Sequence, residues 1–373
     1  MSGGAAAAAV GAVPGLAEAA GPSIAALAKA KGVRFGSAVG AGKAGSLTGS
    51  FEDRRYRRVL AKECGVLVPE NELKWYVLRP DAETFDFERA DRIAAFARKH
   101  RMALRGHTLL WHHPQWFPAW LKAHDFGTGP AATINAQAML VDHIQKVVAH
   151  YPQIDSWDVV NETIDPKDGA IRHTVFSDAM GQEQTLDLAF HTARAAAPRA
   201  RLVYNDYMGW EAGNEAHRTG VLKLLEGFRK RGTPVDALGV QSHLGTEDPA
   251  APGSLGGPQE KAWRAFLDDV TGMGYDLLIT EFDVNDRDLP SDVAARDAAG
   301  AAVAKAYLDL MLDYRQTKEV LAWGMVDKYS WLQNFTPRKD GLAKRATLYD
   351  DAYKPKPMRE AVAAAFRAAP VRA

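Results

Sequence analysis

Residues 276–283 read Asp-Leu-Leu-Ile-Thr-Glu-Phe-Asp, and this stretch indicates the fold class of the chain. It contains a near-continuous apolar run, which is typical of a strand buried on both faces of a parallel sheet. Because successive side chains of a strand point to opposite faces, Glu281 and Asp283 share one face and Phe282 takes the other. The stretch therefore predicts a buried strand over residues 276–281 that ends at Glu281, with Asp283 just beyond it on the same face.

Seven further runs of this kind alternate with amphipathic helical stretches. They cover residues 33–39, 66–69, 102–107, 156–161, 201–205, 237–242 and 320–324. Strict alternation of eight strand–helix pairs predicts an α/β fold, a single closed (β/α)8 TIM barrel. The alternative, an open doubly wound sheet, usually has a glycine-rich phosphate loop after its first strand. We interpret the glycines of 40–45 as an ordinary loop, because no helix with a following acidic ribose ligand appears at the expected distance.

The connections between these elements differ in length. Those from helix to strand are short, whereas those from strand to helix are long, as at 108–133, 163–181, 243–259 and 325–355. In a barrel the long connections lie at the C-terminal ends of the strands, where active sites are built. One of the helices has Ile134, Ala138, Val141 and Val148 on one side, which predicts that this face packs against the barrel.

The N-terminus differs from the rest of the chain. Residues 1–22 are alanine-rich and look like the apolar core of an export signal, with a small-x-small cleavage site at residues 17–19. The basic residues that normally precede such a core are missing. We favour a signal-peptide remnant over a flexible alanine-rich tail, and expect a secreted or periplasmic protein. No linker interrupts residues 23–373, which we expect to form one catalytic barrel domain.

Composition excludes several classes of protein. The chain has 46 Lys and Arg against 46 Asp and Glu, so no basic excess points to nucleic acid, and a neutral polymer is an equally natural partner. No apolar run is long enough to span a bilayer, so we expect no membrane partner. The single cysteine, Cys64, permits neither an intramolecular disulfide nor a cysteine-based zinc site, and we interpret it as a core residue.

Polar and aromatic side chains gather at the ends of the predicted strands. The sequences at these ends include 69–75, 106–108, 161–162, 205–207, 241–243 and 281–283. Carboxylates surrounded by amides and aromatic rings suit a sugar, which presents hydroxyls and flat apolar faces. Glycosidic cleavage needs two carboxyl groups that flank the bond, one protonated and one ionised. The set therefore favours hydrolysis of a glycosidic bond.

Two motifs carry a resemblance to a known family. The segment 157–162 (WDVVNE) and the segment 279–283 (ITEFD) resemble the acid/base and nucleophile strands of glycoside hydrolase family 10, the endo-β-1,4-xylanases. PENELKW, RGHTLLWH, NDY, GVQSHL, WGMVD and YDDAYKPKP follow in the family's order, over roughly residues 33–360. Val68 and Leu73 stand where the family often has Thr and Met, but neither touches an expected catalytic group.

The resemblance implies a retaining enzyme that cleaves internal β-1,4-xylosidic bonds. Glu162 is then the acid/base and Glu281 the nucleophile, with a covalent glycosyl-enzyme intermediate. It implies that His243 and Asp283 orient Glu281. The implied substrate-binding residues are Glu70, Asn71, Lys74, His107, Trp111, Asn161, Gln241, Trp323 and Trp331.

The partners implied are xylan and xylo-oligosaccharides, with no cofactor and no metal, and we expect a monomer. We expect the negative charge of Glu281 to raise the pKa of Glu162. Trp116 and Trp120 match no role in the family, and we interpret them as packing residues.

Three other functions remain open at this point. A metal-dependent hydrolase could use the side chains of His107, His112, His113 and Asp206, although histidines at alternate positions of one strand are absent. A glucan-cleaving retaining barrel would need the same pair of glutamates. A sugar-binding protein without activity is disfavoured by the presence of both.

Overall fold

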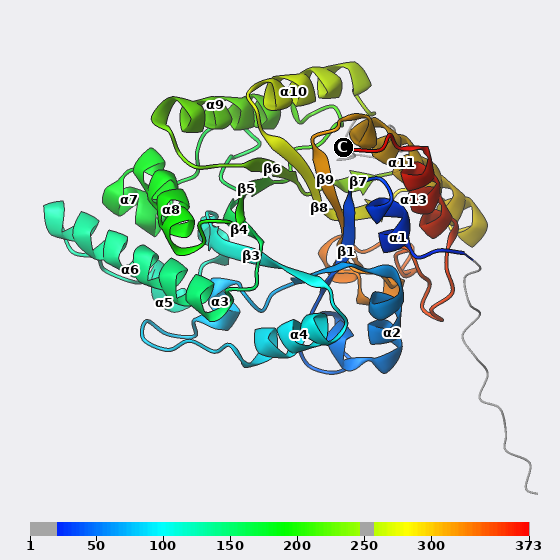
Figure 1. The fold of residues 1–373 in the computed structure, drawn as a ribbon, viewed down its shortest axis with the longest axis horizontal. Coiled ribbons are helices and arrows are strands. Elements are labelled where there is room, and N and C mark those ends of the chain that lie inside the picture. The colour runs from blue at the N-terminus through cyan, green and yellow to red at the C-terminus, as the bar shows by residue number, and fades with distance from the viewer. Residues whose placement is uncertain (1–20, 247–256, 373) are drawn as a thin grey trace, which may run out of the picture.

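The computed structural model describes residues 21–246 and 257–372. The predicted leader therefore lies almost wholly outside the described residues. The predicted barrel is confirmed: eight parallel strands close on themselves and helices surround them (Figure 1). The strands of the barrel are β1 (Arg34–Val39), β2 (Val66–Pro69), β3 (Ala103–Trp111), β4 (Ser156–Asn161), β5 (Arg201–Asp206), β6 (Ala237–Val240), β8 (Asp276–Asn285) and β9 (Thr317–Ala322).

Neighbouring strands pair in chain order, and two pairings complete the circle. β1 pairs with β9, and β6 pairs with β8. A ninth short strand, β7 (His243–Gly245), pairs with the outer end of β8, His243 opposite Asp283. β3 and β8 both run further toward the mouth of the barrel than the sequence predicted. Trp111 and Asp283 therefore lie within these strands and not in the loops after them.

The helices form a ring outside the barrel. They are α1 (Ile24–Lys29), α2 (Arg54–Glu63), α3 (Trp75–Leu78), α4 (Glu88–Lys99), α5 (Ala119–Lys122), α6 (Gly129–His150), α7 (Val175–Met180), α8 (Gln182–Ala196), α9 (Glu215–Arg231), α10 (Glu260–Gly272), α11 (Val293–Asp313), α12 (Leu332–Phe335) and α13 (Pro357–Ala368). Short 3-10 turns cover Leu47–Glu52, Pro114–Trp116 and Asp327–Tyr329. α1, α11 and α13 lie side by side, so the two ends of the described chain meet on one flank (Figure 1).

The buried face of α6 differs from the prediction. Ile134 is 63% exposed, so the expected face is wrong. The buried residues of α6 are Ala132, Ala136, Leu140, His143, Ile144, Val147 and Val148. This helix carries apolar residues on several sides, so periodicity alone left its orientation poorly determined.

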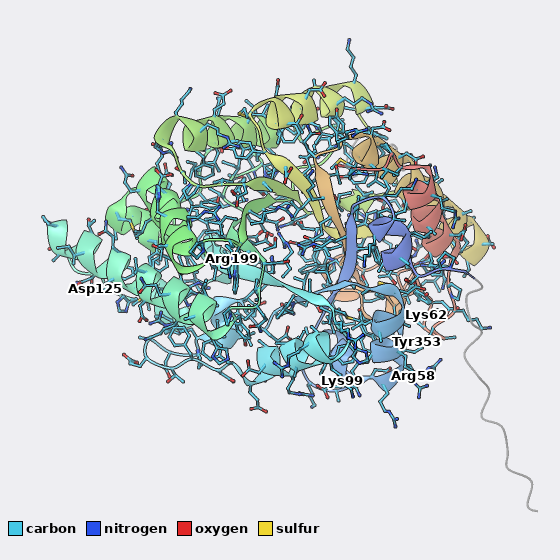
Figure 2. All side chains as sticks on the ribbon, in the orientation of Figure 1. Arg58, Lys62, Lys99, Asp125, Arg199 and Tyr353 are labelled. Carbon is cyan, nitrogen blue, oxygen red and sulfur yellow. The ribbon has the colours of Figure 1, made fainter. Side chains whose placement is uncertain are left out.

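Apolar side chains form most of the buried core, and charged side chains cover the outer faces of the helices. Charged side chains such as those of Arg58, Lys62 and Lys99 project outward from α2 and α4 (Figure 2). Cys64 is buried and free, as expected of a core residue. Within residues 21–246 and 257–372, no helix combines the length and apolarity that a membrane crossing requires.

Candidate active site

Glu162 follows β4 directly and is held by two hydrogen bonds. Trp111 Nε1 donates to its Oε2 at 2.8 Å, and Gln241 Nε2 donates to its Oε1 at 2.9 Å. Its φ of +55° lies in the left-handed region, a strained conformation that is common at functional sites. The neighbouring strand β5 holds this backbone conformation in place, because the Glu162 N–H donates to the carbonyl of Asn205 at 2.9 Å.

Burial raises the pKa of Glu162 from its usual 4.5 to about 7. The negative charge of Glu281 is a smaller cause of this rise, and the hydrogen bonds from Gln241 and Trp111 oppose it. The expectation that the charge of Glu281 contributes is thus confirmed, but burial is the larger cause. A carboxyl group with this pKa can hold a proton and release it near neutral pH.

Glu281 lies on β8 with 5% of its surface exposed. Its Oε1 accepts a hydrogen bond from Asn205 Nδ2 at 2.9 Å, and its Oε2 lies 3.3 Å from His243 Nε2. Burial alone would raise its pKa, but the hydrogen bond from His243 and the positive charges of His107, His243 and Lys74 outweigh burial. The pKa of Glu281 falls to about 2, so this carboxylate is ionised at neutral pH.

His243 lies between two carboxylates. Its Nδ1 is 2.9 Å from Asp283 Oδ1, and Trp331 Nε1 donates to the other oxygen of Asp283 at 2.8 Å. Burial lowers the pKa of His243, but Asp283 and Glu281 outweigh this effect and raise it to about 10. His243 is therefore an imidazolium at neutral pH, with both ring nitrogens available as donors.

The nine predicted substrate-binding residues all lie at this mouth. Lys74 Nζ sits 4.5 Å from the ring centre of Trp111 and 5.7 Å from that of Trp323. The His107 ring packs edge-on against Trp323 at 5.3 Å, and the Trp331 ring lies 4.9 Å from that of His243. Gln241 Nε2 also reaches Asn161 Oδ1 at 3.3 Å.

Glu70 and Asn71 close the side of the site formed after β2. Lys74 Nζ lies 3.5 Å from Asn71 Oδ1, to which the Tyr76 hydroxyl also donates at 2.7 Å. Burial, reinforced by the charge of Glu72, raises the pKa of Glu70 to about 8. Glu70 therefore carries a proton at neutral pH and can donate a hydrogen bond to a sugar hydroxyl.

The sequence analysis assigned no role to Asn205 and Asp158, and both residues organise this site. Thr280 Oγ1 donates to Asn205 Oδ1 at 2.6 Å, which turns the Asn205 nitrogen toward both Glu281 and Asn161. Asp158 Oδ2 holds His107 Nδ1 at 2.8 Å from the neighbouring strand. Asn205 and Asp158 belong to the motif segments NDY and WDVVNE, so their place in these motifs could have identified them.

Trp116 and Trp120, which follow β3, were both predicted to be packing residues, and this prediction holds for Trp120 alone. Trp120 Nε1 donates to the Arg79 carbonyl at 2.9 Å, and its ring packs near Trp75. Trp116 is 36% exposed and stacks on Trp111, with ring centres 5.2 Å apart and an interplanar angle of 20°. Trp116 therefore extends the aromatic wall of the site outward.

Two of the residues considered as metal ligands, His112 and Asp206, bind other groups of the protein. His112 Nε2 contacts the Arg172 carbonyl at 3.1 Å, and Asp206 Oδ1 pairs with His217 Nε2 at 3.0 Å. In the part of the chain that the structure describes, no three His, Cys, Asp or Glu side chains are grouped to hold a metal ion.

Fold and site together define a (β/α)8 barrel whose mouth holds one carboxyl group that can carry a proton and one that stays ionised, the arrangement of a glycoside hydrolase. Comparison with known proteins agrees. The model of glycosyl hydrolase family 10 matches residues 23–365, and the chain belongs to this family. The resemblance inferred from the motifs is thus confirmed.

Individual relatives extend the comparison. Endo-1,4-beta-xylanase B of Thermotoga neapolitana is 30% identical over 306 residues, which cover 81% of this chain and 81% of that protein. The structure of xylanase 10B from Thermotoga maritima matches with a TM-score of 0.79 and 29% identity, over 92% of this chain and 98% of that one. Xylanase 10B from Thermotoga petrophila, solved with xylobiose, matches with a TM-score of 0.80 and 28% identity, over 95% and 98%.

Proposed function

We propose that the protein is an endo-acting β-1,4-xylanase that cleaves xylan with retention of configuration at the anomeric carbon. The observation that carries this proposal is the pair of carboxyls held in one site, Glu162 by Gln241 and Glu281 by Asn205, with pKa values displaced in opposite directions, to about 7 and about 2. Membership of the family supports retention. The names of the relatives, xylanases throughout, support the choice of substrate.

In the first step, Glu281 attacks the anomeric carbon of the sugar on the glycone side. Glu162 gives its proton to the glycosidic oxygen, so the leaving chain departs as a neutral alcohol and a glycosyl-enzyme forms on Glu281. His243 keeps Glu281 ionised before the attack and stays hydrogen-bonded to the oxygen that does not react. Glu162 loses its proton only in this step, because its raised pKa keeps it substantially protonated near neutral pH.

In the second step, Glu162 acts as a base. It takes a proton from a water molecule that has replaced the leaving chain, and the hydroxide attacks the same anomeric carbon. The bond to Glu281 breaks, and the carboxylate is regenerated. The two steps together use two side-chain carboxyls, one transferred proton and one water molecule, so the proposed reaction needs no cofactor.

The other residues of the site bind the sugars. Asn161, held by Asn205 and Gln241, is placed to bond the 2-hydroxyl of the reacting sugar. Lys74, His107, Trp111, Gln241 and Trp331 enclose that sugar, and Glu70, Asn71 and Trp323 hold the next sugar outward. We infer that the protein acts outside the cytoplasm, because a polysaccharide is too large to cross a membrane unaided.

The test uses two aryl glycosides with one leaving group. Xylose lacks the hydroxymethyl group of glucose, and we expect the indoles of Trp331 and Trp323 to exclude that group. The aryl β-xylobioside should therefore exceed the aryl β-cellobioside in kcat/KM by at least about tenfold. Trp331→Ala should narrow the ratio, mainly by improving the glucoside. Equal kcat/KM on the two glycosides would refute the choice of xylan. An α-anomer as first product in proton NMR would refute retention.

A further inference from the structure

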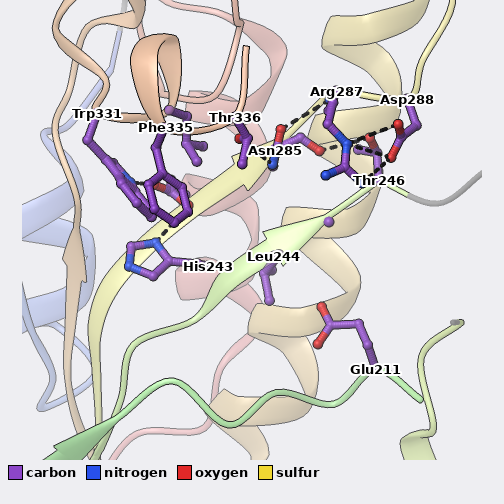
Figure 3. Close-up of a pocket in the computed structure, with 13 residues that line it drawn as sticks. Glu211, His243, Leu244, Thr246, Asn285, Arg287, Asp288, Trp331, Phe335 and Thr336 are labelled. Atoms are coloured by element: carbon purple, nitrogen blue, oxygen red, sulfur yellow. Dashed lines mark hydrogen bonds and ion pairs between the residues drawn. The ribbon is translucent and has the colours of Figure 1, made fainter. Parts of the chain in front are cut away.

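A pocket opens beside the candidate active site, between the loops that follow β5, β6, β8 and β9 (Figure 3). Its volume is about 700 Å³, including the open mouth. His243 and Trp331 form the wall that it shares with the site. The opposite wall contains Arg287 and Asp288 at the end of β8, and Leu244 of β7 lines its floor.

One wall of the pocket is an exposed aromatic ring. Phe335 is 61% exposed, the highest value for any Phe, Tyr or Trp in the described part of the chain. Its ring packs on Trp331 with centres 4.4 Å apart, so one face covers the indole and much of the rest faces the pocket and solvent. The exposed ring borders the cavity, and sugars stack on aromatic rings through their C–H faces.

The polar groups of the pocket suit hydroxyls. Asn285 Nδ2 donates to Thr336 Oγ1 at 3.1 Å, and its Oδ1 accepts from Lys344 Nζ and from the Arg287 N–H, so the Thr336 hydroxyl keeps its own proton to donate at the rim. Arg287 Nε and Nη2 bond the carboxylate of Asp288 at 2.9 to 3.2 Å. A guanidinium–carboxylate pair presents both donors and acceptors, which is what a vicinal pair of hydroxyls requires.

The charges of the lining favour a neutral ligand. Its carboxylates are those of Glu211, Asp283 and Asp288, and its cations are those of His243 and Arg287. Arg287 is bound by Asp288, and His243 is bound by Asp283. Because both cations of the described lining already face carboxylates, neither offers an uncompensated positive charge to an anion.

We propose that this pocket binds a neutral sugar ring of the substrate, outside the positions next to the scissile bond. The proposal rests on the proposed function, since the ring is part of a xylan. Two sources offer the same chemistry: a further xylose of the backbone, or a neutral branch such as an arabinofuranose. Assays on linear and branched substrates distinguish the two sources.

Gly245 allows the pocket to be filled without disturbing its walls. It lines the pocket, and a Cβ built on it meets no atom within 4 Å. Gly245→Leu therefore adds a bulky side chain to the lining at a position that accepts a Cβ, and Gly245→Ala, which adds the Cβ alone, is the matched control. Phe335→Ala is a second variant that removes the aromatic wall. Its control is Leu342→Ala, which shortens another exposed side chain (43%) outside the lining of the pocket.

Each variant is assayed on linear xylohexaose, on an arabinose-branched oligosaccharide and on one with a glucuronate branch. Every kcat/KM is divided by that for the aryl β-xylobioside. Gly245→Leu and Phe335→Ala should lower this ratio about tenfold for a neutral substrate, with the two controls unchanged. A loss on the branched substrate alone identifies a branch, and a loss on xylohexaose identifies the backbone. Unchanged ratios in both variants overturn the proposal, as does a pocket-dependent preference for the glucuronate branch.

A binding measurement separates this proposal from the proposed function. In the Glu281→Gln variant, saturation-transfer NMR should show contact of the protein with protons of the branch or of the outer xylose. Adding Gly245→Leu should abolish that contact, while protons of the sugars next to the scissile bond keep theirs. Lack of turnover on any β-xyloside would refute the proposed function alone. Contacts that persist with Gly245→Leu would refute the pocket alone.

Discussion

Replacing Glu281 by glutamine tests the coupling of the two carboxyl groups most directly. The substitution removes a negative charge but keeps the size of the side chain and an oxygen that can accept from Asn205 or His243. Glu162 then keeps its burial and its bonds from Trp111 and Gln241. Any change in its pKa therefore reports the charge of Glu281.

The size of the change follows from the causes of the raised pKa. The pKa of Glu162 lies at about 7 instead of 4.5. This difference corresponds to about 3 kcal/mol between the two protonation states. Burial is the largest cause, and the charge of Glu281 is a smaller one that acts in the same direction. We expect Glu281→Gln to lower the pKa of Glu162 by about one unit, or about 1.4 kcal/mol, and to leave it above 4.5.

The pKa is measured by carbon-13 NMR of protein labelled at the glutamate side-chain carboxyls. The signal of Glu162 is assigned by its disappearance in Glu162→Gln. A titration midpoint that does not move would show that the two carboxyls are not coupled. A midpoint that falls to 4.5 would show that the charge of Glu281, and not burial, is the main cause. Either result would refute burial reinforced by Glu281 as the origin of the raised pKa.

Two further changes test other charges in the protein. His243→Asn removes the hydrogen bond and the positive charge that lower the pKa of Glu281, so burial should raise that pKa. The acidic limb of the kcat/KM profile should then move to higher pH. An unmoved limb would contradict the role of His243. His143 is stacked between Trp75 and Phe85, and burial holds its pKa well below 6.5. The unfolded chain binds a proton below pH 6.5 that folded His143 does not, so folding stability falls as pH falls, by up to about 1.4 kcal/mol per pH unit. His143→Phe should flatten this decline in urea unfolding between pH 6.5 and 4.5, and an equal slope would exclude His143 as a source.

The sequence predicted the barrel because its signals are local. Each buried parallel strand is an apolar run, and the observed bounds of β2 and β4 equal the predicted ones. The predicted end of β3 was too early, because Thr108–Trp111 continues as strand only through pairing with β4 across a shift in register. The orientation of α6 failed for a similar reason: contacts with the rest of the fold, not periodicity, select its buried face.

The residues of the site were predicted more completely than the forces that act on them. Motif spacing identified Glu162 and Glu281, but not that burial dominates the pKa of the first. Burial depends on every loop that covers the mouth, and no short motif encodes it. Trp116 shows the same limit, since its stack on Trp111 depends on the path of the loop after β3.

The interior of the barrel explains how a buried carboxylate can stay ionised. Arg105 and His107 are two residues apart on β3, so both side chains point inward. The guanidinium of Arg105 pairs with both oxygens of Asp158, whose Oδ2 also holds His107 at 2.8 Å. Below them, Glu319 of β9 lies 3.6 Å from Arg105 Nε and 3.0 Å from Arg34 Nε.

Barrel interiors are commonly filled by branched apolar residues, and buried ion pairs contribute little net stability. A column of charges from Arg34 up to His107 is therefore poorly explained as a stabilising core. The contacts of Asp158 and His107, at the upper end of the column, explain it better. Asp158 orients His107, and the positive charge of His107 is one of those that lower the pKa of Glu281. Because Arg105 and Glu319 balance the charges beneath, Asp158 can hold His107 in place without contact with water. The polar interior thus belongs to the machinery that keeps the proposed nucleophile charged.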